Sequence, residues 1–238
     1  MTDMKPFADK LALVTGASRG IGAAIAEALA ANGAHVVLVA RTAQAMEEVE
    51  ERIHQAGGSA TIAPVDLSDM EQIDKLAAAI GGRWEALDLI VLNAAMLGSL
   101  SPVEHLDPKE LERVFRLNLL ANQKLLSAFD PLLRRAARAE VVALTSSVGH
   151  QPRAFWGGYG ASKAALEALI ASYAAETAHT GRIRVHTIDP GATRTRMRAL
   201  AFPGEAAEDV KPPEQVADWL VARLRGDAPT GERVRVEE

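Results

Sequence analysis

Residues 10–22, KLALVTGASRGIG, decide the fold that this sequence predicts. Lys10–Thr15 has the composition of a short buried strand, Gly16 to Gly22 form a glycine turn, and the alanine-rich stretch that follows favours a helix. The glycines would let the backbone approach a pyrophosphate closely, and the helix N-terminus would offer unpaired N–H groups to its charge. The spacing G-x-x-x-G-x-G is neither the G-x-G-x-x-G fingerprint nor a P-loop. Taken alone, it fits an ordinary tight turn equally well.

Apolar runs alternate with helical stretches along the rest of the chain, which is the pattern of βαβ units and a parallel sheet. The expected strands are Leu11–Thr15, His35–Ala40, Ser59–Pro64, Leu87–Asn93, Val141–Ser146, Arg184–Asp189 and Arg233–Val236. The expected helices are Ala24–Asn32, Ala43–Ala56, Met70–Ile80, Pro108–Arg138, Tyr159–His179 and Pro213–Arg225. We therefore expect one α/β domain over residues 1–238, a Rossmann-type, doubly wound parallel sheet of about seven strands with helices on both faces.

Composition fits one globular domain and argues against several classes of protein. The 238 residues are 48% hydrophobic and 24% charged, with a formal net charge of −5 and no basic tail, so nucleic acid is not an expected partner. No apolar run approaches the roughly 20 residues of a membrane span, and the N-terminus lacks the apolar core of a signal peptide. The chain has no cysteine, and its six histidines show no metal-binding spacing. We expect a cytoplasmic protein that binds no metal and no membrane.

Tyr159 and Lys163 stand four residues apart in YGASK, thirteen and seventeen residues after Ser146. A helix carries positions i and i+4 on one face, so the ammonium would lie beside the phenol and favour its ionised form. A free tyrosine has a pKa of about 10 and carries protons poorly at neutral pH, whereas one held beside a cation is a candidate acid/base. Alone, the pair also fits a solvated surface pair on a helix.

Six separated sequence motifs together indicate that Tyr159 and Lys163 are more than a surface pair. They are TGASRGIG at 15–22, Asn93-Ala94-Ala95, Asn118, Ser146, YGASK at 159–163 and Pro190-Gly191. In order and spacing they resemble the classical short-chain dehydrogenase/reductase family, over about residues 10–236. The phrases TSSVGHQPRAFWGGYGASK and DPGATRTRMRALAFP look most similar to a bacterial oxidoreductase branch whose substrate is not well defined. The resemblance implies an oxidoreductase that transfers hydride between a nicotinamide cofactor and a small-molecule carbonyl or secondary alcohol.

The same resemblance implies a catalytic tetrad of Asn118, Ser146, Tyr159 and Lys163. In the reductive direction Tyr159 would donate the proton, and Ser146 would donate a hydrogen bond to the same substrate oxygen. Lys163 would bind the nicotinamide ribose and stabilise the tyrosinate, and Asn118 would hold a water that feeds protons to the lysine. Two other functions share these motifs: a 3-oxoacyl-carrier-protein reductase, and an NADP-binding sensor or scaffold that no longer catalyses.

Charge at the end of the second strand favours one cofactor. An NAD enzyme usually places a carboxylate there, about 20 residues after the glycine turn, whereas a 2′-phosphate needs cations. Here the strand ends Val39-Ala40-Arg41, and Arg19 lies inside the glycine loop. Two guanidinium groups could hold the phosphate, so we expect NADP(H) to be preferred over NAD(H). The alternative is that both arginines are solvated surface residues.

Further cofactor contacts are implied by the resemblance. Asp66 matches the acid that meets the adenine amino group, Asn93 begins the stretch along the adenosine ribose, and Thr195 matches the position that orients the nicotinamide carboxamide. The expected cofactor-binding residues are Gly16, Ser18, Arg19, Gly20, Ile21, Gly22, Arg41, Asp66, Leu67, Asn93, Ala94, Tyr159, Lys163, Pro190, Gly191, Thr193 and Thr195. The family pattern Asn-Asn-Ala-Gly is Leu92-Asn93-Ala94-Ala95 here, so the first Asn, thought to brace the sheet, is lost.

The sequence says less about which residues bind the substrate. Residues 201–213, AFPGEAAEDVKPP, lie where this family places its substrate lid, so we expect a short lid near 194–212. Arg194, Arg196 and Arg198 beside it suggest an anionic substrate, or else a solvated arginine face. Family members usually pair through the helices that carry Asn118 and Tyr159, which implies a homodimer or homotetramer.

Overall fold

The fold is built on a seven-stranded, all-parallel sheet with helices. The computed structural model describes residues 5–237 of the chain. The strands lie in the order β3-β2-β1-β4-β5-β6-β7. Their bounds are β1 (Leu11–Thr15), β2 (His35–Ala40), β3 (Ser59–Pro64), β4 (Leu89–Leu92), β5 (Ala139–Leu144), β6 (Ile183–Asp189) and β7 (Arg233–Arg235). The predicted doubly wound α/β fold is confirmed.

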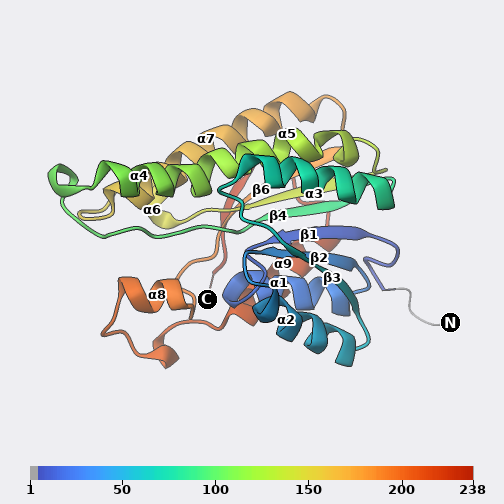
Figure 1. Cartoon of the computed structure of the whole chain (residues 1–238), viewed down its shortest axis with the longest axis horizontal. Coiled ribbons are helices and arrows are strands. Elements are labelled where there is room, and N and C mark those ends of the chain that lie inside the picture. The colour runs from blue at the N-terminus through green and yellow to red at the C-terminus, as the bar shows by residue number, and fades with distance from the viewer. Residues whose placement is uncertain (1–4, 238) are drawn as a thin grey trace.

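Helices cover both faces of this sheet (Figure 1). One layer holds α3 (Met70–Arg83), α4 (Pro108–Phe115), α5 (Ala121–Leu133) and α7 (Gly157–Ala178), and the other holds α1 (Gly20–Ala31), α2 (Ala43–Gln55) and α9 (Pro213–Arg225). The shorter elements are α6 (Ser147–His150), α8 (Arg196–Ala201), the π-helical segment η2 (Arg116–Leu120) and the 3-10 turns η1 (Val103–His105) and η3 (Ala207–Asp209).

Two separate apolar cores lie above and below the sheet. Successive residues of a strand point to opposite faces, so Leu13 packs into the core under α3, α5 and α7, while Val14 packs into the core over α1, α2 and α9. Both residues are fully buried, as is Ile90 in the next strand. A parallel sheet buried on both faces needs such continuous apolar strands, which is why the sequence shows apolar runs rather than alternation.

Strand order fixes where a site can form. The chain begins in the middle of the sheet at β1, moves outward to β2 and β3, and then returns to β4 on the other side. Loops that leave β1 and β4 therefore diverge, and in folds of this kind ligands bind beside the carboxyl ends of these strands. Because all seven strands are parallel, every loop that follows a strand lies at this same edge.

The helix predicted over Pro108–Arg138 is wrong as one regular helix. The chain runs through α4, then the π-helical η2, then α5, and leaves the helix after Leu133. Asn118 in η2 is completely buried and bonds to the segment after β4, which the sequence pattern could not show. α1 also begins at Gly20, four residues before the predicted start, because the close packing of the glycine loop outweighs the low helix propensity of glycine.

Within residues 5–237, no helix is both long enough and apolar enough to cross a membrane. The same part of the chain holds no group of three or more histidine or acidic side chains placed to bind a metal ion.

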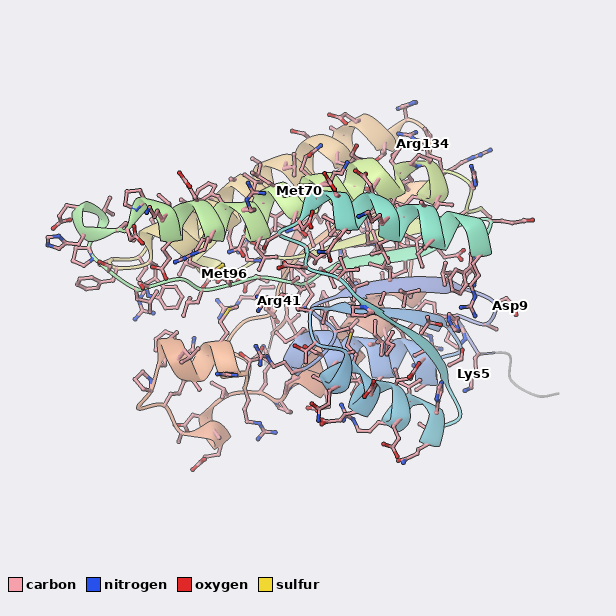
Figure 2. All side chains as sticks on the ribbon, in the orientation of Figure 1. Lys5, Asp9, Arg41, Met70, Met96 and Arg134 are labelled. Atoms are coloured by element: carbon pink, nitrogen blue, oxygen red, sulfur yellow. The ribbon has the colours of Figure 1, made fainter. Side chains whose placement is uncertain are left out.

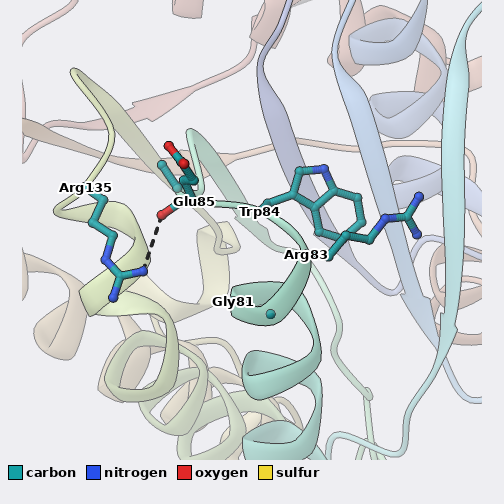
Figure 3. Close-up of a pocket in the computed structure, with 7 residues that line it drawn as sticks. Gly81, Arg83, Trp84, Glu85 and Arg135 are labelled. Carbon is teal, nitrogen blue, oxygen red and sulfur yellow. Dashed lines mark hydrogen bonds between the residues drawn. The ribbon is translucent and has the colours of Figure 1, made fainter.

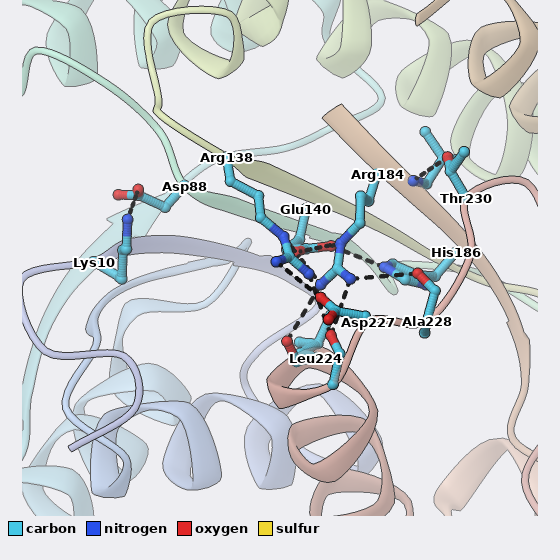
Figure 4. A network of polar contacts seen from close by, with 12 residues as sticks. Lys10, Asp88, Arg138, Glu140, Arg184, His186, Leu224, Asp227, Ala228 and Thr230 are labelled. Atoms are coloured by element: carbon cyan, nitrogen blue, oxygen red, sulfur yellow. Dashed lines mark hydrogen bonds and ion pairs between the residues drawn. The ribbon is translucent and has the colours of Figure 1, made fainter. Parts of the chain in front are cut away.

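At the opposite, amino edge of the sheet, Glu140 organises a network of charges (Figure 4). Its carboxylate accepts a hydrogen bond from Arg184 Nε at 2.9 Å and lies 2.8 Å from Nε2 of the buried His186. Arg184 in turn donates to the carbonyls of Gly226 and Ala228. One buried carboxylate thus ties β5, β6 and the chain after α9 together.

We predict that Glu140→Ala lowers the free energy of unfolding by about 3–5 kcal/mol, because it leaves the mostly buried guanidinium of Arg184 without its carboxylate partner. Glu27→Ala is the matched control, since its pair with Arg52 is exposed and should contribute less than about 1 kcal/mol. Urea titration followed by circular dichroism measures both. Equal losses in the two variants would show that the Glu140 network carries no special stability.

Candidate active site

The glycine loop between β1 and α1 is shaped by close approaches that only glycine allows. Gly16 has φ +65° and Gly20 has φ +56°, the left-handed region that glycine adopts freely. A β-carbon on Gly16 would lie 2.8 Å from Asn93 Nδ2, and one on Gly22 would collide with the Gly16 carbonyl oxygen. The loop therefore presents bare backbone at the carboxyl edge of the sheet.

This loop fits an anion such as a phosphate group. α1 begins after Arg19 without a side-chain cap and has no acidic residue in its first turn, so its first N–H groups are open to a ligand. Ser18 and Ile21 lie in the same loop and first turn. Arg19 and Arg41 are exposed, and within residues 5–237 neither forms an ion pair. Arg41 lies just past the end of β2, at the same edge of the sheet as Met96 (Figure 2).

Asn93 braces this loop, which corrects the expectation drawn from Leu92. Its Nδ2 donates to the Thr15 carbonyl at 2.8 Å and to the Gly16 carbonyl at 3.3 Å. The Thr15 hydroxyl accepts from the backbone N–H groups of Asn93 and Ala94. Leu92 is buried in the core, so the junction of β1 and β4 is held by Asn93 and Thr15 without a second asparagine.

Ser146, Tyr159 and Lys163 come together beyond the carboxyl end of β5. Ser146 has an extended backbone and does not cap α6, which leaves its hydroxyl for a hydrogen bond with Tyr159. Tyr159 and Lys163 occupy successive turns of α7 and are 7% and 2% exposed. Gly149 of α6 allows this packing, since a β-carbon there would lie 2.9 Å from Lys163 Cβ.

Burial sets the proton affinity of both groups. It raises the pKa of Tyr159, the negative charge of Asp189 raises that pKa further, and the Ser146 hydrogen bond opposes both effects. Burial also lowers the pKa of Lys163 to about 8, against the opposing charge of Glu167. The Lys163 ammonium donates to the Leu144 carbonyl at 2.7 Å and lies 5.9 Å from the centre of the Tyr159 ring. The pKa of Tyr159 therefore shifts in the direction opposite to the one expected from Lys163 alone, because burial and Asp189 raise it.

Asn118 locks two segments of the site together. Its side-chain oxygen accepts from Met96 N–H at 2.9 Å, and its Nδ2 donates to the Met96 carbonyl and to Ser162 Oγ. Ser162 donates to the Tyr159 carbonyl in turn. The Asn118 amide is thus engaged by protein groups, and it joins the chain after β4 to the first turns of α7.

The other predicted cofactor residues lie on both sides of this centre. Asp66 follows the edge strand β3 and accepts from Ser68 N–H at 2.9 Å, and the side chain of the neighbouring Leu67 is buried in the core. Both lie two strands away from β1, on the side opposite Ser146.

Beyond β6, Gly191 has φ +68°, and the Thr193 hydroxyl donates to the Pro190 carbonyl at 3.1 Å. Thr195 caps α8 by accepting from Arg198 N–H, and its methyl group would be 3.4 Å from a β-carbon on Gly20. The loops after β1 and β6 therefore meet at Thr195.

An aromatic row connects the expected lid to Tyr159. Trp156 lies edge-on to Tyr159 with ring centres 6.1 Å apart, and Phe202 stacks on Trp156 at 5.6 Å. Arg198 covers Phe202 at 3.7 Å and pairs with Glu205, whose pKa it lowers. Because Glu205 balances the charge of Arg198, only Arg194 and Arg196 remain for the hypothesis of an anionic substrate.

Three charged residues beside the tetrad were missed by the sequence analysis: Glu167, Asp189 and Arg233. Glu167 stands four residues after Lys163 on α7, a spacing that could have revealed it. Asp189 ends β6 directly before Pro190, where a strand-end carboxylate could also have been noticed. Arg233 offers no such signal, because its place beside them depends on the register of β6 and β7.

A shallow hollow of about 500 Å³ elsewhere does not belong to this site (Figure 3). It lies where α3 leads into β4, at the amino edge of the sheet, and Arg83, Trp84, Glu85 and Arg135 line it. Arg83 stacks over Trp84 at 4.4 Å, and Arg135 donates to the Glu85 carbonyl. No residue of the tetrad reaches it.

Comparisons with known proteins agree with this geometry. A family model described as short chain dehydrogenase matches residues 10–206. The uncharacterized oxidoreductase YciK of Escherichia coli K12 is 36% identical over 219 residues, which is 90% of this chain and 86% of its own. The fatty acyl-CoA reductase of Acinetobacter baylyi is 37% identical over 214 residues, which is 89% of this chain and 72% of its own.

Solved structures show the same similarity over the whole chain. A short chain dehydrogenase from Salmonella enterica serovar Typhi has a TM-score of 0.93 at 33% identity and covers 100% of both chains. One from Escherichia coli CFT073, complexed with NADPH, has a TM-score of 0.91 at 35% identity and covers 99% of this chain and 100% of its own. Since the family model spans most of the sheet and the whole of the tetrad, this chain belongs to the short chain dehydrogenase family.

Proposed function

We propose that this oxidoreductase uses NADP(H) to interconvert a carbonyl compound and its secondary alcohol, with Tyr159 as the acid/base. The observation that carries the proposal is the hydrogen bond of Ser146 to Tyr159, which is buried with Lys163 at the same edge of the sheet as the uncapped start of α1. A bound NADPH would supply the hydride. The complex of a similar chain with NADPH supports this choice of cofactor.

Each residue contributes a distinct step. The raised pKa of Tyr159 keeps its hydroxyl protonated at neutral pH, so it can deliver a proton to the oxygen that becomes negative during reduction. Ser146 shares a hydrogen bond with this hydroxyl and could donate to the same substrate oxygen. Lys163 is the buried cation beside the phenol, where it would stabilise the tyrosinate left after the proton transfer. Asn118 ties the loop that contains Met96 to α7 through its bonds to Met96 and Ser162.

The preference for NADP(H) over NAD(H) belongs to the same proposal. Arg19 and Arg41 are exposed and form no ion pair within the described residues; Arg19 ends the loop after β1, and Arg41 begins the loop after β2. A 2′-phosphate placed there would meet two guanidinium groups, which match its geometry.

We extend the proposal to the surroundings of the site. Residues 194–212 would form a short lid whose Phe202 rests on Trp156, and α5 and α7 would pair with a second copy to give a homodimer or homotetramer in the cytoplasm. The apolar row of Trp156 and Phe202 suits a substrate with apolar parts. Acyl thioesters belong among the compounds to test, since one relative is named a fatty acyl-CoA reductase.

The first prediction separates the two tyrosines of the chain, which both lie on α7. Tyr159→Phe should lower turnover by about 10²–10⁴-fold, because it removes the proton donor and leaves the ring in place. Tyr173→Phe is the matched control and should leave turnover nearly unchanged, since Tyr173 bonds to Asp130 instead. NADPH oxidation across ketones, aldehydes, quinones and acyl thioesters measures both.

Full activity of Tyr159→Phe would rule out the proposed acid/base. An unmodified chain that binds NADPH but turns over nothing in the panel would favour the alternative of a sensor or scaffold. Turnover of acyl thioesters on carrier protein alone would favour the 3-oxoacyl-carrier-protein reductase.

For the cofactor, Arg41→Ala should weaken NADPH binding by about 10- to 100-fold and barely change NADH binding, because only NADPH has the 2′-phosphate. Fluorescence titration with each nucleotide tests this. Arg83→Ala, at the amino edge of the sheet, should affect neither. Equal losses for both nucleotides would contradict a phosphate contact at Arg41.

The pH dependence should follow Lys163. Its pKa of about 8 means that the ammonium is present below that pH and is lost above it. We therefore expect kcat/KM for reduction to fall with a midpoint near pH 8, measured at constant ionic strength from about pH 6 to about pH 10. A decline that starts only near the ordinary lysine pKa of 10.5 would show that burial does not control this group.

A further inference from the structure

Arg233, the first residue of β7, reaches behind the candidate active site and joins three segments of it. Its Nε donates to Glu167 Oε1 on α7 at 3.0 Å. Its Nη2 lies 3.3 Å from Asp189 Oδ2 at the end of β6 and 3.4 Å from the Ser146 carbonyl beyond β5. A single guanidinium thus contacts the segments that carry the serine, the Tyr159 and Lys163 helix, and the Pro190 loop.

The two carboxylates held by Arg233 act on the two central residues of the tetrad. The negative charge of Asp189 raises the pKa of Tyr159, and the negative charge of Glu167, on the next turn of α7, raises the pKa of Lys163. Their side chains are only 3% and 15% exposed, so water screens them poorly and they need compensation within the protein.

The remaining neighbours of these carboxylates are mostly neutral. The Thr145 hydroxyl donates to Glu167, and Gly191 N–H donates to Asp189. Tyr159 itself meets the Ser146 hydroxyl, the Trp156 ring and the Lys163 ammonium. Among residues 5–237, Arg233 is therefore the cation that forms ion pairs with both Glu167 and Asp189.

We propose that Arg233 is a positioning residue of the active site: it fixes the Ser146 carbonyl and neutralises the carboxylates of Asp189 and Glu167 that lie behind Tyr159 and Lys163. Its catalytic consequence rests on the function proposed above, but its electrostatic role does not. Without the guanidinium, both carboxylates would act at full strength on their neighbours. Lys163 and Tyr159 would then hold their protons more tightly, since a nearby negative charge favours the protonated form of each.

The test compares variants of neighbouring arginines on one strand. Arg233→Met and Arg233→Gln remove the charge and keep an unbranched side chain, and Arg233→Lys keeps the charge without the fork. Arg235→Met is the matched control, because Arg235 is exposed on the same strand. NMR of isotope-labelled lysine Cε, with the Lys163 signal identified by its loss in Lys163→Arg, follows the titration of Lys163 in the protein without nucleotide or substrate.

We expect the Lys163 midpoint to rise by about one pH unit in Arg233→Met and Arg233→Gln, to rise less in Arg233→Lys, and to stay in place in Arg235→Met. The high-pH decline of kcat/KM should move upward by the same amount. If the Met variant fails to fold, the Gln variant, which can still hydrogen-bond to the Ser146 carbonyl, decides the question.

An unchanged Lys163 midpoint in the folded charge-removing variants would overturn the proposal and leave Arg233 as a structural tie, even if thermal stability fell. Because the titration needs no turnover, it decides the role of Arg233 in a chain that reduces none of the substrates. Conversely, Tyr159-dependent turnover with an unmoved midpoint would keep the proposed function and reject this inference alone.

Discussion

The junction of β1, β4 and α1 is the constraint on which the rest of the structure depends. Thr15 and Asn93 exchange side-chain and backbone hydrogen bonds across the two strands, and Asn93 also holds the Gly16 carbonyl. Gly22 must then pass against the same carbonyl, which forces α1 to start with open N–H groups at the edge of the sheet. The shape of the glycine loop and the open N–H groups at the start of α1 both follow from this one contact region.

Burial shifts the pKa values of the two central residues of the candidate active site. Tyr159 and Lys163 lie in the core layer between α7 and the sheet, where taking charge out of water disfavours ionisation of both. Their opposite responses to burial keep the phenol protonated and bring the ammonium within reach of neutral pH. The charges behind them also act on these two pKa values: Arg233 pairs with Glu167 and Asp189, the carboxylates whose charges act on Lys163 and Tyr159.

Much of the fold could be predicted from the sequence, because strands and helices follow from patterns of neighbouring residues. Apolar runs predicted β1, β2 and β3 with their observed bounds, and YGASK lies on α7, which was predicted as a helix and brings Tyr159 and Lys163 together. What failed depends on distant partners. The helix predicted over Pro108–Arg138 is interrupted by a π turn, in which Asn118 bonds to Met96 outside the helix. The raised pKa of Tyr159 reflects packing rather than spacing, and Arg233 reaches its partners only through the pairing of β7 with β6.

The π-helical segment Arg116–Leu120 takes up one residue more than a regular helix would hold at this place. An extra residue in an α-helix would rotate the following chain by about 100°, and the wider π turn absorbs it without that rotation. Loss of a single residue from the segment would therefore restore a regular helix and leave the apolar face of α5, with Leu125 and Phe129, turned to the core. The cost of such a deletion would fall on Asn118 instead, because its bonds to Met96 and Ser162 depend on its place in the π turn.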